Sequence, residues 1–396
     1  MRIGIDACCW SNRRGFGRFT RELVARMVLD RPGHEFVLMV DRVTADQSEF
    51  PSGATVCVVE TREQPTQAAS AQGSRSPGDL WRLGRAASAQ RLDAFFFPAV
   101  YSFYPLLRRV PTAVTFHDAI AEQHPELIFP GLRSRLFWRA KMWLALRQAD
   151  RIVTVSEAAR DQIASAFRYP ASTICVIPEG PGAEFRMLDD RAPVARVLDR
   201  YRLPVDRPLI LYVGGISPHK NLEGLLRALA RIYQTSDVTW HLALVGDYLS
   251  DSFHSCYQSL MFLRDKLGLQ DRVTFTGFVP DDHLVALYNA ATMLVLPSFS
   301  EGFGLPVVEA MACGVPIAAS RRGSLPEVAG KAGLFFDPED HAEMAATILR
   351  LLGSAELREE LRAEGRQKVK TYSWSVAAGR VVSLFEDMIH GSAKSA

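Results

Sequence analysis

Two successive series of short apolar segments, separated by amphipathic stretches, constrain the fold of this 396-residue chain most strongly. Apolar runs bounded by glycine, proline and polar residues predict buried strands, and the stretches between them have the periodicity of helices. The first series predicts strands at about 2–7, 35–40, 54–59, 93–97, 111–116, 151–155 and 173–177, with helices near 17–29, 79–91, 131–148 and 156–165. This alternation is typical of a parallel sheet with helices on both faces.

The pattern starts again near residue 208, which predicts a second domain. Its strands are predicted at 208–213, 240–246, 273–278, 293–298 and 316–320, followed by a helical tail from about 338 to 390. Residues 179–207 are rich in proline, aspartate and arginine and are interpreted as a linker. We therefore expect an α/β protein of two doubly wound, Rossmann-like domains that face a central cleft. The expected division is 1–185, 186–372 and a C-terminal helix, 373–396, that crosses back to the first domain.

Composition argues against several classes of protein. The formal net charge is only +2, so no global basic field indicates a nucleic-acid-binding protein. The six cysteines form no Cys-x-x-Cys pair and have no histidines at zinc spacing, which indicates neither a metal site nor a disulfide scaffold and favours a reducing cytoplasm. No apolar run approaches the roughly 18 residues that a membrane-spanning helix needs. The chain enters its first predicted strand at once, without the pattern of a signal peptide.

Glu301 and Glu309 stand at the two ends of the segment EGFGLPVVE, the most informative motif in the chain. A predicted strand precedes it, and Pro306 suits the first position of a following helix. Backbone N–H groups in such a loop and at a helix N-terminus attract phosphate. Here they belong to Gly302, Phe303, Gly304 and Leu305. The carboxylates would accept hydrogen bonds from hydroxyl groups on either side of a diphosphate, which favours a nucleotide-sugar site. The alternative is an ordinary turn before a helix whose dipole favours glutamate.

Two further loops follow strands of the second series. Gly215 lies in the segment GGISPHKN, 214–221, where small residues allow a ligand to approach the backbone. Lys220 in the same segment either offers a cation to a diphosphate leaving group or is a solvated surface lysine. Phe278 closes the strand predicted at 273–278. Either the backbone around it reads the edge of a base, or its side chain belongs to the core.

The first series also places polar residues and glycines after its strands. Gly15 and Gly17 join the first strand to its helix and offer another close backbone approach. His117 ends the strand predicted at 111–116 and is either a structural histidine or a site residue at a strand terminus. Asp41 ends the second strand, so an NAD-dependent dehydrogenase remains an alternative. Against it, Thr20 stands where the dinucleotide-binding fingerprint has its third glycine.

Two other segments have unusual composition. The helix predicted at 131–148 carries five arginines and lysines and no acidic residue, interleaved with Phe137, Trp138 and Trp143. It either contacts anionic lipid headgroups, giving a peripheral membrane contact, or has one buried apolar face and one solvated basic face, which is the interpretation we favour. Residues 61–79 contain no large apolar side chain and are predicted to form a mobile surface loop.

Taken together, these motifs resemble those of family 4 glycosyltransferases, which are retaining enzymes of the two-domain GT-B type. The resemblance covers nearly the whole chain and is densest in 209–330. There Glu301 to Glu309 is similar to the family's Glu-x7-Glu signature, and the segment GSLPE at 323–327 follows it. The segments VTVSE at 153–157 and YSW at 372–374 also resemble family segments.

The resemblance implies a role for each matching residue. Glu309 would bind the nucleotide ribose, and Glu301 would contact the donor sugar and phosphates together with the amides of the glycine loop. Lys220 would stabilise the departing diphosphate, and His117 would lie beside the donor sugar. The implied catalytic residues are thus His117, Lys220 and Glu301. The implied donor-binding residues are Gly15, Gly17, Gly215, Lys220, Phe278, Glu301, Gly302, Phe303, Gly304, Leu305 and Glu309. Ser156 would line the cleft from the first domain.

One departure from the family pattern concerns phosphate charge. An arginine that the family usually places near Gly215 is absent, and Arg18 or loop amides would have to substitute for it. The loop of the form Gly-x-x-x-Pro-x-Lys-Asn resembles a subgroup that includes bacterial mannosyltransferases of surface-polysaccharide synthesis. This implies a GDP-mannose-like donor, with UDP- or dTDP-sugars as the other options, and a glycan or lipid-linked acceptor.

The implied reaction is a front-face displacement with retention of configuration. The chain contains no Asp-x-Asp motif, so we expect neither a metal nor another cofactor. The expected location is the cytoplasm, with peripheral contact at the inner face of the membrane as the further option. An epimerase or hydrolase that acts on nucleotide sugars with the same two-domain architecture remains the principal alternative function.

Overall fold

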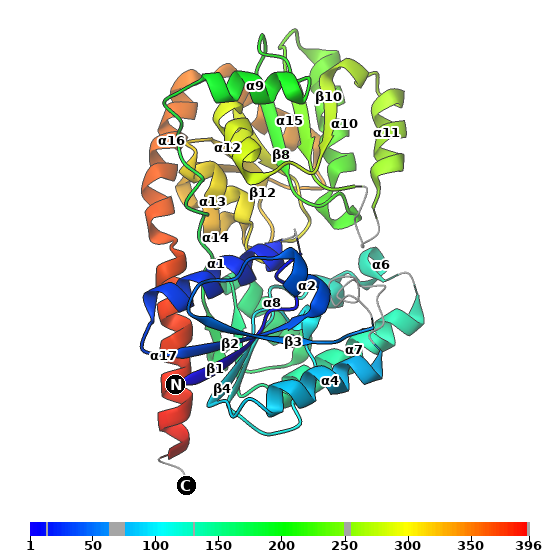
Figure 1. Cartoon of the computed structure of the whole chain (residues 1–396). Coiled ribbons are helices and arrows are strands. Elements are labelled where there is room, and N and C mark those ends of the chain that lie inside the picture. The colour runs from blue at the N-terminus through cyan, green and yellow to red at the C-terminus, as the bar shows by residue number, and fades with distance from the viewer. Residues whose placement is uncertain (13–14, 63–75, 130, 249–254, 394–396) are drawn as a thin grey trace. The chain divides into compact units, whose positions relative to one another are not determined.

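A computed structural model of the chain shows two compact α/β units (Figure 1). It describes residues 1–12, 15–62, 76–129, 131–248 and 255–393. Unit 1 comprises Met1–Glu179 together with Ser373–Ala396, and unit 2 comprises Gly180–Tyr372. The chain therefore leaves unit 1 once and returns to it for its last helix. Most of the loop expected at 61–79 falls outside the described residues.

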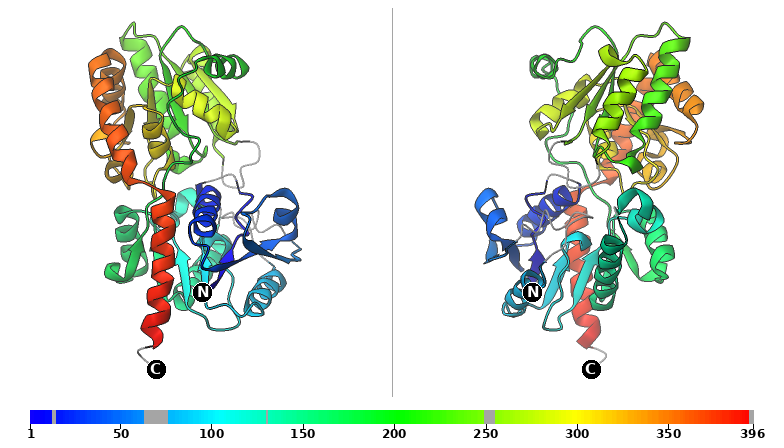
Figure 2. Two further views of the ribbon diagram at one scale, coloured as in Figure 1. Left: turned by 60° about the vertical axis from the view of Figure 1, so that its left-hand side comes forward. Right: turned by 90° about the vertical axis from the view of Figure 1, so that its right-hand side faces the viewer.

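Unit 1 is built on a parallel sheet of seven strands in the order β3-β2-β1-β4-β5-β6-β7. The strands are β1 (Arg2–Asp6), β2 (Glu35–Asp41), β3 (Ala54–Val59), β4 (Ala94–Phe97), β5 (Thr112–Thr115), β6 (Arg151–Thr154) and β7 (Ile174–Val176). The helices are α1 (Gly15–Asp30), α2 (Arg42–Gln47), α4 (Pro77–Ser88), α5 (Ile120–Gln123), α6 (Pro125–Ile128), α7 (Leu132–Gln148), α8 (Glu157–Phe167) and α17 (Trp374–Ala393). Because β1 and β4 are neighbours, the direction of strand addition reverses between them. The last helix, α17, packs against α1 (Figure 2).

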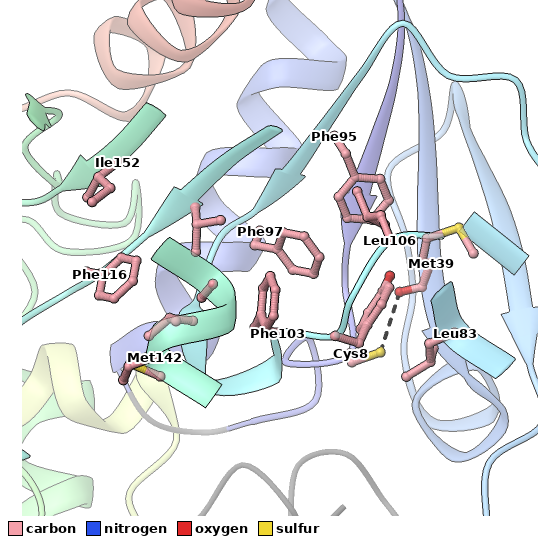
Figure 3. Close-up of a cluster of buried hydrophobic side chains, with 14 of the residues drawn as sticks. Cys8, Met39, Leu83, Phe95, Phe97, Phe103, Leu106, Phe116, Met142 and Ile152 are labelled. Atoms are coloured by element: carbon pink, nitrogen blue, oxygen red, sulfur yellow. Dashed lines mark hydrogen bonds between the residues drawn. The ribbon is translucent and has the colours of Figure 1, made fainter. Parts of the chain in front are cut away.

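The core of unit 1 is rich in phenylalanine. Strand β4 has an unbroken apolar sequence because both faces of a parallel sheet are covered by helices. Figure 3 shows Phe97 of this strand against Phe103, with the ring centroids 5.0 Å apart. Met142 brings one face of α7 into the same cluster, and Cys8 Sγ donates to the Met39 carbonyl at 3.8 Å. The core thus fixes the strand ends from which the loops of unit 1 emerge.

Unit 2 repeats the plan with six parallel strands in the order β10-β9-β8-β11-β12-β13. The strands are β8 (Leu209–Val213), β9 (His241–Val245), β10 (Val273–Gly277), β11 (Met293–Leu296), β12 (Ile317–Ser320) and β13 (Gly333–Phe336). The helices are α9 (Ala192–Arg200), α10 (Leu222–Thr235), α11 (Tyr257–Lys266), α12 (Asp281–Ala290), α13 (Leu305–Ala312), α14 (Leu325–Ala329), α15 (His341–Gly353) and α16 (Ala355–Lys368). Strand addition reverses between β8 and β11.

The expected fold class, two doubly wound α/β domains, is confirmed. The structure differs from the sequence prediction in several elements, and helix α9 lies within the segment 179–207 that was interpreted as a linker. Strand β13 was missed, and the helical tail expected from about 338 to 390 is divided into α15, α16 and α17. Ser354 ends α15 and caps α16, because its Oγ accepts a hydrogen bond from Leu357 N. Within the described residues, no helix is both long enough and apolar enough to cross a membrane.

Candidate functional site

The loops at the carboxyl ends of β8 and β11 lie together in unit 2. Ligands of doubly wound sheets bind at the point where strand addition reverses, and these are the two strands at that point. Phe299 N donates to the His219 carbonyl at 2.9 Å. Asn221 adopts a left-handed conformation, with φ of 53°, and its Nδ2 donates to the carbonyls of Pro297 at 3.1 Å and Pro338 at 2.7 Å. The two loops therefore form one structure.

Lys220 and Glu301 form an ion pair across these loops. Lys220 Nζ lies 2.8 Å from both carboxylate oxygens of Glu301, and Ser298 Oγ donates to Oε1 at 2.6 Å. The two side chains keep 18% and 12% of their surface exposed, so the pair lies at the surface of the unit but is largely desolvated. An ammonium group has three N–H donors, and Glu301 can take at most two of them. Lys220 is thus held in place with donor capacity left over.

The segment 323–327 supports the glycine loop that follows Glu301 through hydrogen bonds to its backbone. Gly304 has φ of 97° and immediately precedes α13, whose second residue, and not its first as expected, is Pro306. Ser324 Oγ lies 2.7 Å from the Phe303 carbonyl and 3.1 Å from the Glu301 carbonyl. These carbonyls point into the unit. Pro306 has no N–H group and Val307 N donates to the Gly304 carbonyl at 2.8 Å, so the donors that this end of α13 could offer a ligand come from Leu305 and the glycine loop.

Glu309 is more deeply buried than we expect of a residue that binds a ribose. It lies in the second turn of α13, not the first as expected, because the helix begins at Leu305. Only 2% of the residue is exposed. Its Oε2 accepts a hydrogen bond from the hydroxyl of Tyr288, on α12, at 2.8 Å. Burial, reinforced by the Glu309 carboxylate, raises the pKa of the nearby Cys313 thiol to about 12.

Phe278 offers an exposed side chain, and Gly215 offers an open stretch of backbone. Phe278 follows β10 and is 43% exposed, so the interpretation that its side chain belongs to the core is wrong. Gly215 accepts a hydrogen bond from the Tyr212 hydroxyl through its carbonyl at 2.7 Å. A Cβ atom at Gly215 would meet nothing within unit 2 closer than Ser217 Oγ at 3.8 Å. The space above this backbone is therefore open within the unit.

Sequence reasoning missed three residues near the same strand ends. Gly246 follows β9, and a Cβ atom there would lie 2.1 Å from the Gly214 carbonyl, so only glycine fits beside the first loop. Tyr248 and Tyr257 stack with their centroids 3.9 Å apart and their planes at 3°. Gly246 could have been recognised from its position directly after a strand. The tyrosine pair has no sequence signature, because a stack between residues nine apart depends on the path of the loop.

In unit 1, His117 is held by groups on both sides of its ring. Its Nε2 lies 3.0 Å from the Pro98 carbonyl, which can only accept, so Nε2 carries a proton. Its Nδ1 lies 3.7 Å from Glu179 Oε1, and the edge of Phe19 packs against the ring at 4.7 Å. Trp374 of α17 also contacts Phe19, at 5.7 Å. His117 is therefore oriented by its neighbours, with Nδ1 beside a carboxylate.

The remaining residues expected at the site in unit 1 are largely structural. Gly17 is buried in α1, and a Cβ atom there would lie 2.1 Å from the Asn12 carbonyl. Gly15 is exposed at the start of α1. Ser156 is fully buried and caps α8, with its Oγ accepting from Ala159 N at 3.0 Å. Asp41 caps α2 by accepting from Thr44 N at 3.0 Å and from Thr44 Oγ1 at 2.6 Å. Asp41 is thus engaged by the fold, which weakens the dehydrogenase interpretation.

A second cluster in unit 1 joins Glu122 to the aromatic residue Trp138. Trp138 Nε1 donates to Glu122 Oε1 at 2.6 Å, and Lys141 Nζ lies 4.4 Å from the centre of the Trp138 ring. Burial is the main cause that raises the pKa of Glu122 to about 7, with the Asp118 carboxylate adding to it. Sequence reasoning did not identify this group. In the part of the chain that the structure describes, no three histidine, cysteine, aspartate or glutamate residues are grouped so as to hold a metal ion.

Models of glycosyltransferase families match both units of the chain. The family model "Glycosyltransferase Family 4" matches residues 13–181, and "Glycosyl transferases group 1" matches residues 196–368. The O-antigen chain mannosyltransferase B of Escherichia coli is 30% identical over 381 residues, which cover 94% of this chain and 96% of that protein.

Solved structures show the same fold. Sucrose-phosphate synthase from Thermosynechococcus elongatus superimposes with a TM-score of 0.77 at 20% identity, covering 99% of this chain and 100% of that one. Anabaena HepE, solved in complex with UDP and glucose, gives 0.74 at 19% identity, covering 97% and 99%. Neither the epimerase nor the dehydrogenase alternative is favoured by these likenesses. The chain belongs to glycosyltransferase family 4 and is a glycosyltransferase of the GT-B type.

Proposed function

We propose that this glycosyltransferase moves a mannosyl residue from a GDP-mannose-like donor to a hydroxyl group of a glycan or lipid-linked acceptor, with retention of configuration. The observation that carries the proposal is the Lys220–Glu301 pair beside the glycine loop, at the reversal of the unit 2 sheet. The choice of mannose is supported by the likeness to a mannosyltransferase over nearly the whole chain.

The diphosphate would be held by two kinds of donor. The N–H groups at the start of α13 and the ammonium of Lys220 lie on neighbouring loops, and both favour an anion. Glu301 holds Lys220 in position and accepts a hydrogen bond from a sugar hydroxyl. The stacked Tyr248 and Tyr257 together with the exposed Phe278 offer aromatic surface for the base. Glu309 would reach the ribose with Tyr288 as its positioning partner.

In the proposed step, the bond from the sugar C1 to the diphosphate oxygen breaks as a bond from C1 to the acceptor oxygen forms on the same face. The acceptor hydroxyl gives its proton to the departing diphosphate, so no carboxylate nucleophile is needed. Lys220 and the α13 amides stabilise the negative charge that develops on the leaving group. His117 would lie beside the sugar, held by the Pro98 carbonyl at Nε2 and by Glu179 near Nδ1.

We also propose that the reaction needs no metal ion, because a lysine and a helix N-terminus supply the positive charge that a divalent cation would otherwise provide. The acceptor would be carried on a lipid or a growing glycan, and the protein would act in the cytoplasm at the inner face of the membrane.

The proposal is tested by incubating the full-length protein with GDP-mannose, UDP-glucose or a dTDP-sugar, a mannose-containing acceptor and EDTA. We expect product from GDP-mannose. NMR should show that the transferred sugar keeps the anomeric configuration that it has in the donor. Preference for a UDP- or dTDP-sugar would replace the proposed donor. An inverted product would contradict the front-face mechanism, and an absolute need for a divalent ion would contradict metal independence.

In the same assay, Lys220→Ala should lower kcat by about 10² to 10³, because a preorganised donor to the leaving group is lost. The matched control is Lys331→Ala, an exposed lysine of the same unit, which should leave kcat unchanged. A Lys220→Ala protein with the wild-type kcat would remove the site assignment.

A further inference from the structure

Helix α17 packs on unit 1 along one face only. The packed face consists of buried residues spaced three and four apart, namely Trp374, Ala377, Ala378, Val381, Val382, Phe385 and Met388. A neighbouring face lines a groove of about 780 Å³, which Cys175, Val176 and Ile177 of the β7 segment also line. Strand β7 is the last in the order of the seven-stranded sheet. The groove therefore lies at the edge of unit 1, on the side where α17, red in Figure 2, runs.

The groove face of α17, defined as the part that lines this groove, differs in composition from a solvated helix. Its residues are Ser375, Val376, Gly379, Arg380, Ser383, Leu384 and Asp387. Val376 is 54% exposed, although it is apolar. The solvated helix α16 instead carries ion pairs along its surface, such as Arg362 with Glu359. Small side chains allow a second helix to approach closely, and exposed apolar side chains gain from being covered.

Three charged side chains line the groove, and all of them are exposed. Arg31 directly follows α1, whereas Arg380 and Asp387 belong to the groove face. Within the described ranges, none of the three forms an ion pair. A Cβ atom at Gly379 would lie 2.7 Å from a guanidinium nitrogen of Arg31, so Arg31 lies against α17 at the position before Arg380. Two neighbouring cations thus lack a carboxylate, and one carboxylate of the same groove lacks a cation.

From these observations we propose that a second copy of the chain occupies the groove, with two α17 helices packed antiparallel about a twofold axis. A twofold interface brings the same patch of both copies together, so the patch must be complementary to itself. Arg380 and Asp387 are seven residues apart, which is about two helical turns, and they therefore lie on one side of α17. They are also equally far from the point between Ser383 and Leu384. An axis through this point sets Arg380 of each copy opposite Asp387 of the other.

Such an arrangement uses every charge of the groove. Asp387 of one copy meets Arg380 of the other and, beside it, Arg31. The contact occurs twice because of the symmetry. Gly379 and Ser383 allow the two helices to approach each other, and the apolar residues of the groove face are removed from water. The ion pairs fix the register and direction of the helices, whereas the apolar contacts supply the affinity.

Another kind of occupant fits the groove less well. An acidic peptide or a phosphorylated ligand would satisfy the two arginines but would bring its negative charge close to Asp387. A second copy supplies a cation for Asp387 as well as a carboxylate for the arginines. The inference does not rest on the proposed donor or acceptor, because it uses residues outside the Lys220–Glu301 site.

The test is sedimentation equilibrium of the full-length protein over a range of concentrations. Wild-type protein should associate into a dimer. Arg380→Asp should raise the Kd of the dimer by about tenfold or more, because it sets carboxylate against carboxylate at both contacts. Asp387→Arg should have the same effect, because arginines then face each other. The control, Arg196→Asp on α9, makes the same change at an exposed arginine of unit 2 and should dimerise as wild type.

The variant that combines Arg380→Asp with Asp387→Arg exchanges the two charges and restores opposite signs at both contacts. It should recover most of the affinity that each single variant loses. Both residues are exposed, so all three variants should give the circular dichroism spectrum of the wild type. A wild-type protein that stays monomeric at every concentration would overturn the inference, and so would a dimer that both single variants leave intact. Failure of the combined variant to regain affinity would contradict the antiparallel pairing and would also overturn it.

Discussion

Lys220 and Glu301 show how two common surface residue types come to form a fixed ion pair. Each would be solvated on an isolated helix, but the loops of β8 and β11 bring them to 2.8 Å and Ser298 adds a hydrogen bond to the carboxylate. Both residues were singled out from the sequence because each lies in a motif that directly follows a predicted strand. Their pairing was not predicted, because 81 residues separate them and only the order of the strands makes them neighbours.

Glu122 is a residue that the sequence could not identify. Its environment comes from α5 and α7, and nothing in its local sequence indicates burial beside Trp138. The Tyr248–Tyr257 stack escaped prediction for the same reason. Side chains whose role depends on a tertiary contact alone are the ones that sequence reasoning missed.

The raised pKa of Glu122 predicts a pH-dependent stability of unit 1. The folded protein holds a proton on Glu122 up to about pH 7, whereas the unfolded chain loses it near the ordinary value of 4.5. The folded state therefore binds more protons between these values, and stability falls as pH rises through this window. Glu122→Gln keeps an acceptor for Trp138 without the charge. It should match wild type at pH 4 and be more stable by about 2 kcal/mol at pH 8.

Tryptophan fluorescence during urea unfolding measures this effect in unit 1, because five of the six tryptophans, all except Trp240, lie there. The matched control is Glu126→Gln, an exposed glutamate on α6 whose replacement should not alter the pH dependence. Equal stability of Glu122→Gln and wild type at pH 8 would show that Glu122 is not held protonated.

At the scale of elements, α13 and α14 act together as a support for the glycine loop. The sequence predicted α13 from Pro306 and its apolar periodicity, and the helix is where expected. Strand β13 was not predicted because its four residues follow a short helix and lack the flanking turn pattern of the other strands. The breaks in the C-terminal helical tail depend on the cap at Ser354 and on the short turn before Trp374, which local periodicity does not separate from continuous helix.

Gly323 provides a test of the support at this scale. It has φ of 64°, and a Cβ atom there would lie 2.8 Å from Glu301 N. Gly323→Ala should lower the free energy of unfolding by about 1–3 kcal/mol through backbone strain and the clash. Because the clash displaces Glu301, donor binding should weaken as well. Urea unfolding monitored by circular dichroism and calorimetric titration of GDP-mannose measure the two effects.

Gly353→Ala is the control for this substitution. Gly353 ends α15, and a Cβ atom there would meet no neighbour within 4 Å. Its replacement should change stability by no more than about 1 kcal/mol and should leave donor affinity unaltered. Gly323→Ala with wild-type affinity for the donor would show that the segment 323–327 does not position Glu301.

At the scale of the whole molecule, the alternation of strands and helices predicted both units because each is a complete doubly wound sheet. The order of motifs along the chain also carried the family assignment, which the comparisons confirm. The individual site residues stay predictions. The burial of Glu309 shows why motif matching alone is insufficient, since a residue can match a signature and yet bond to a neighbouring side chain, here Tyr288.

The central claim is that the donor binds at the loops after β8 and β11 of unit 2. Hydrogen–deuterium exchange of the full-length protein with and without saturating GDP-mannose tests it most directly, because bound ligand slows the exchange of the amides that it covers. We expect slower exchange in 214–221 and 298–309, with little change in the solvated helix α16. Unchanged exchange in both segments, at a donor concentration that supports turnover, would contradict it.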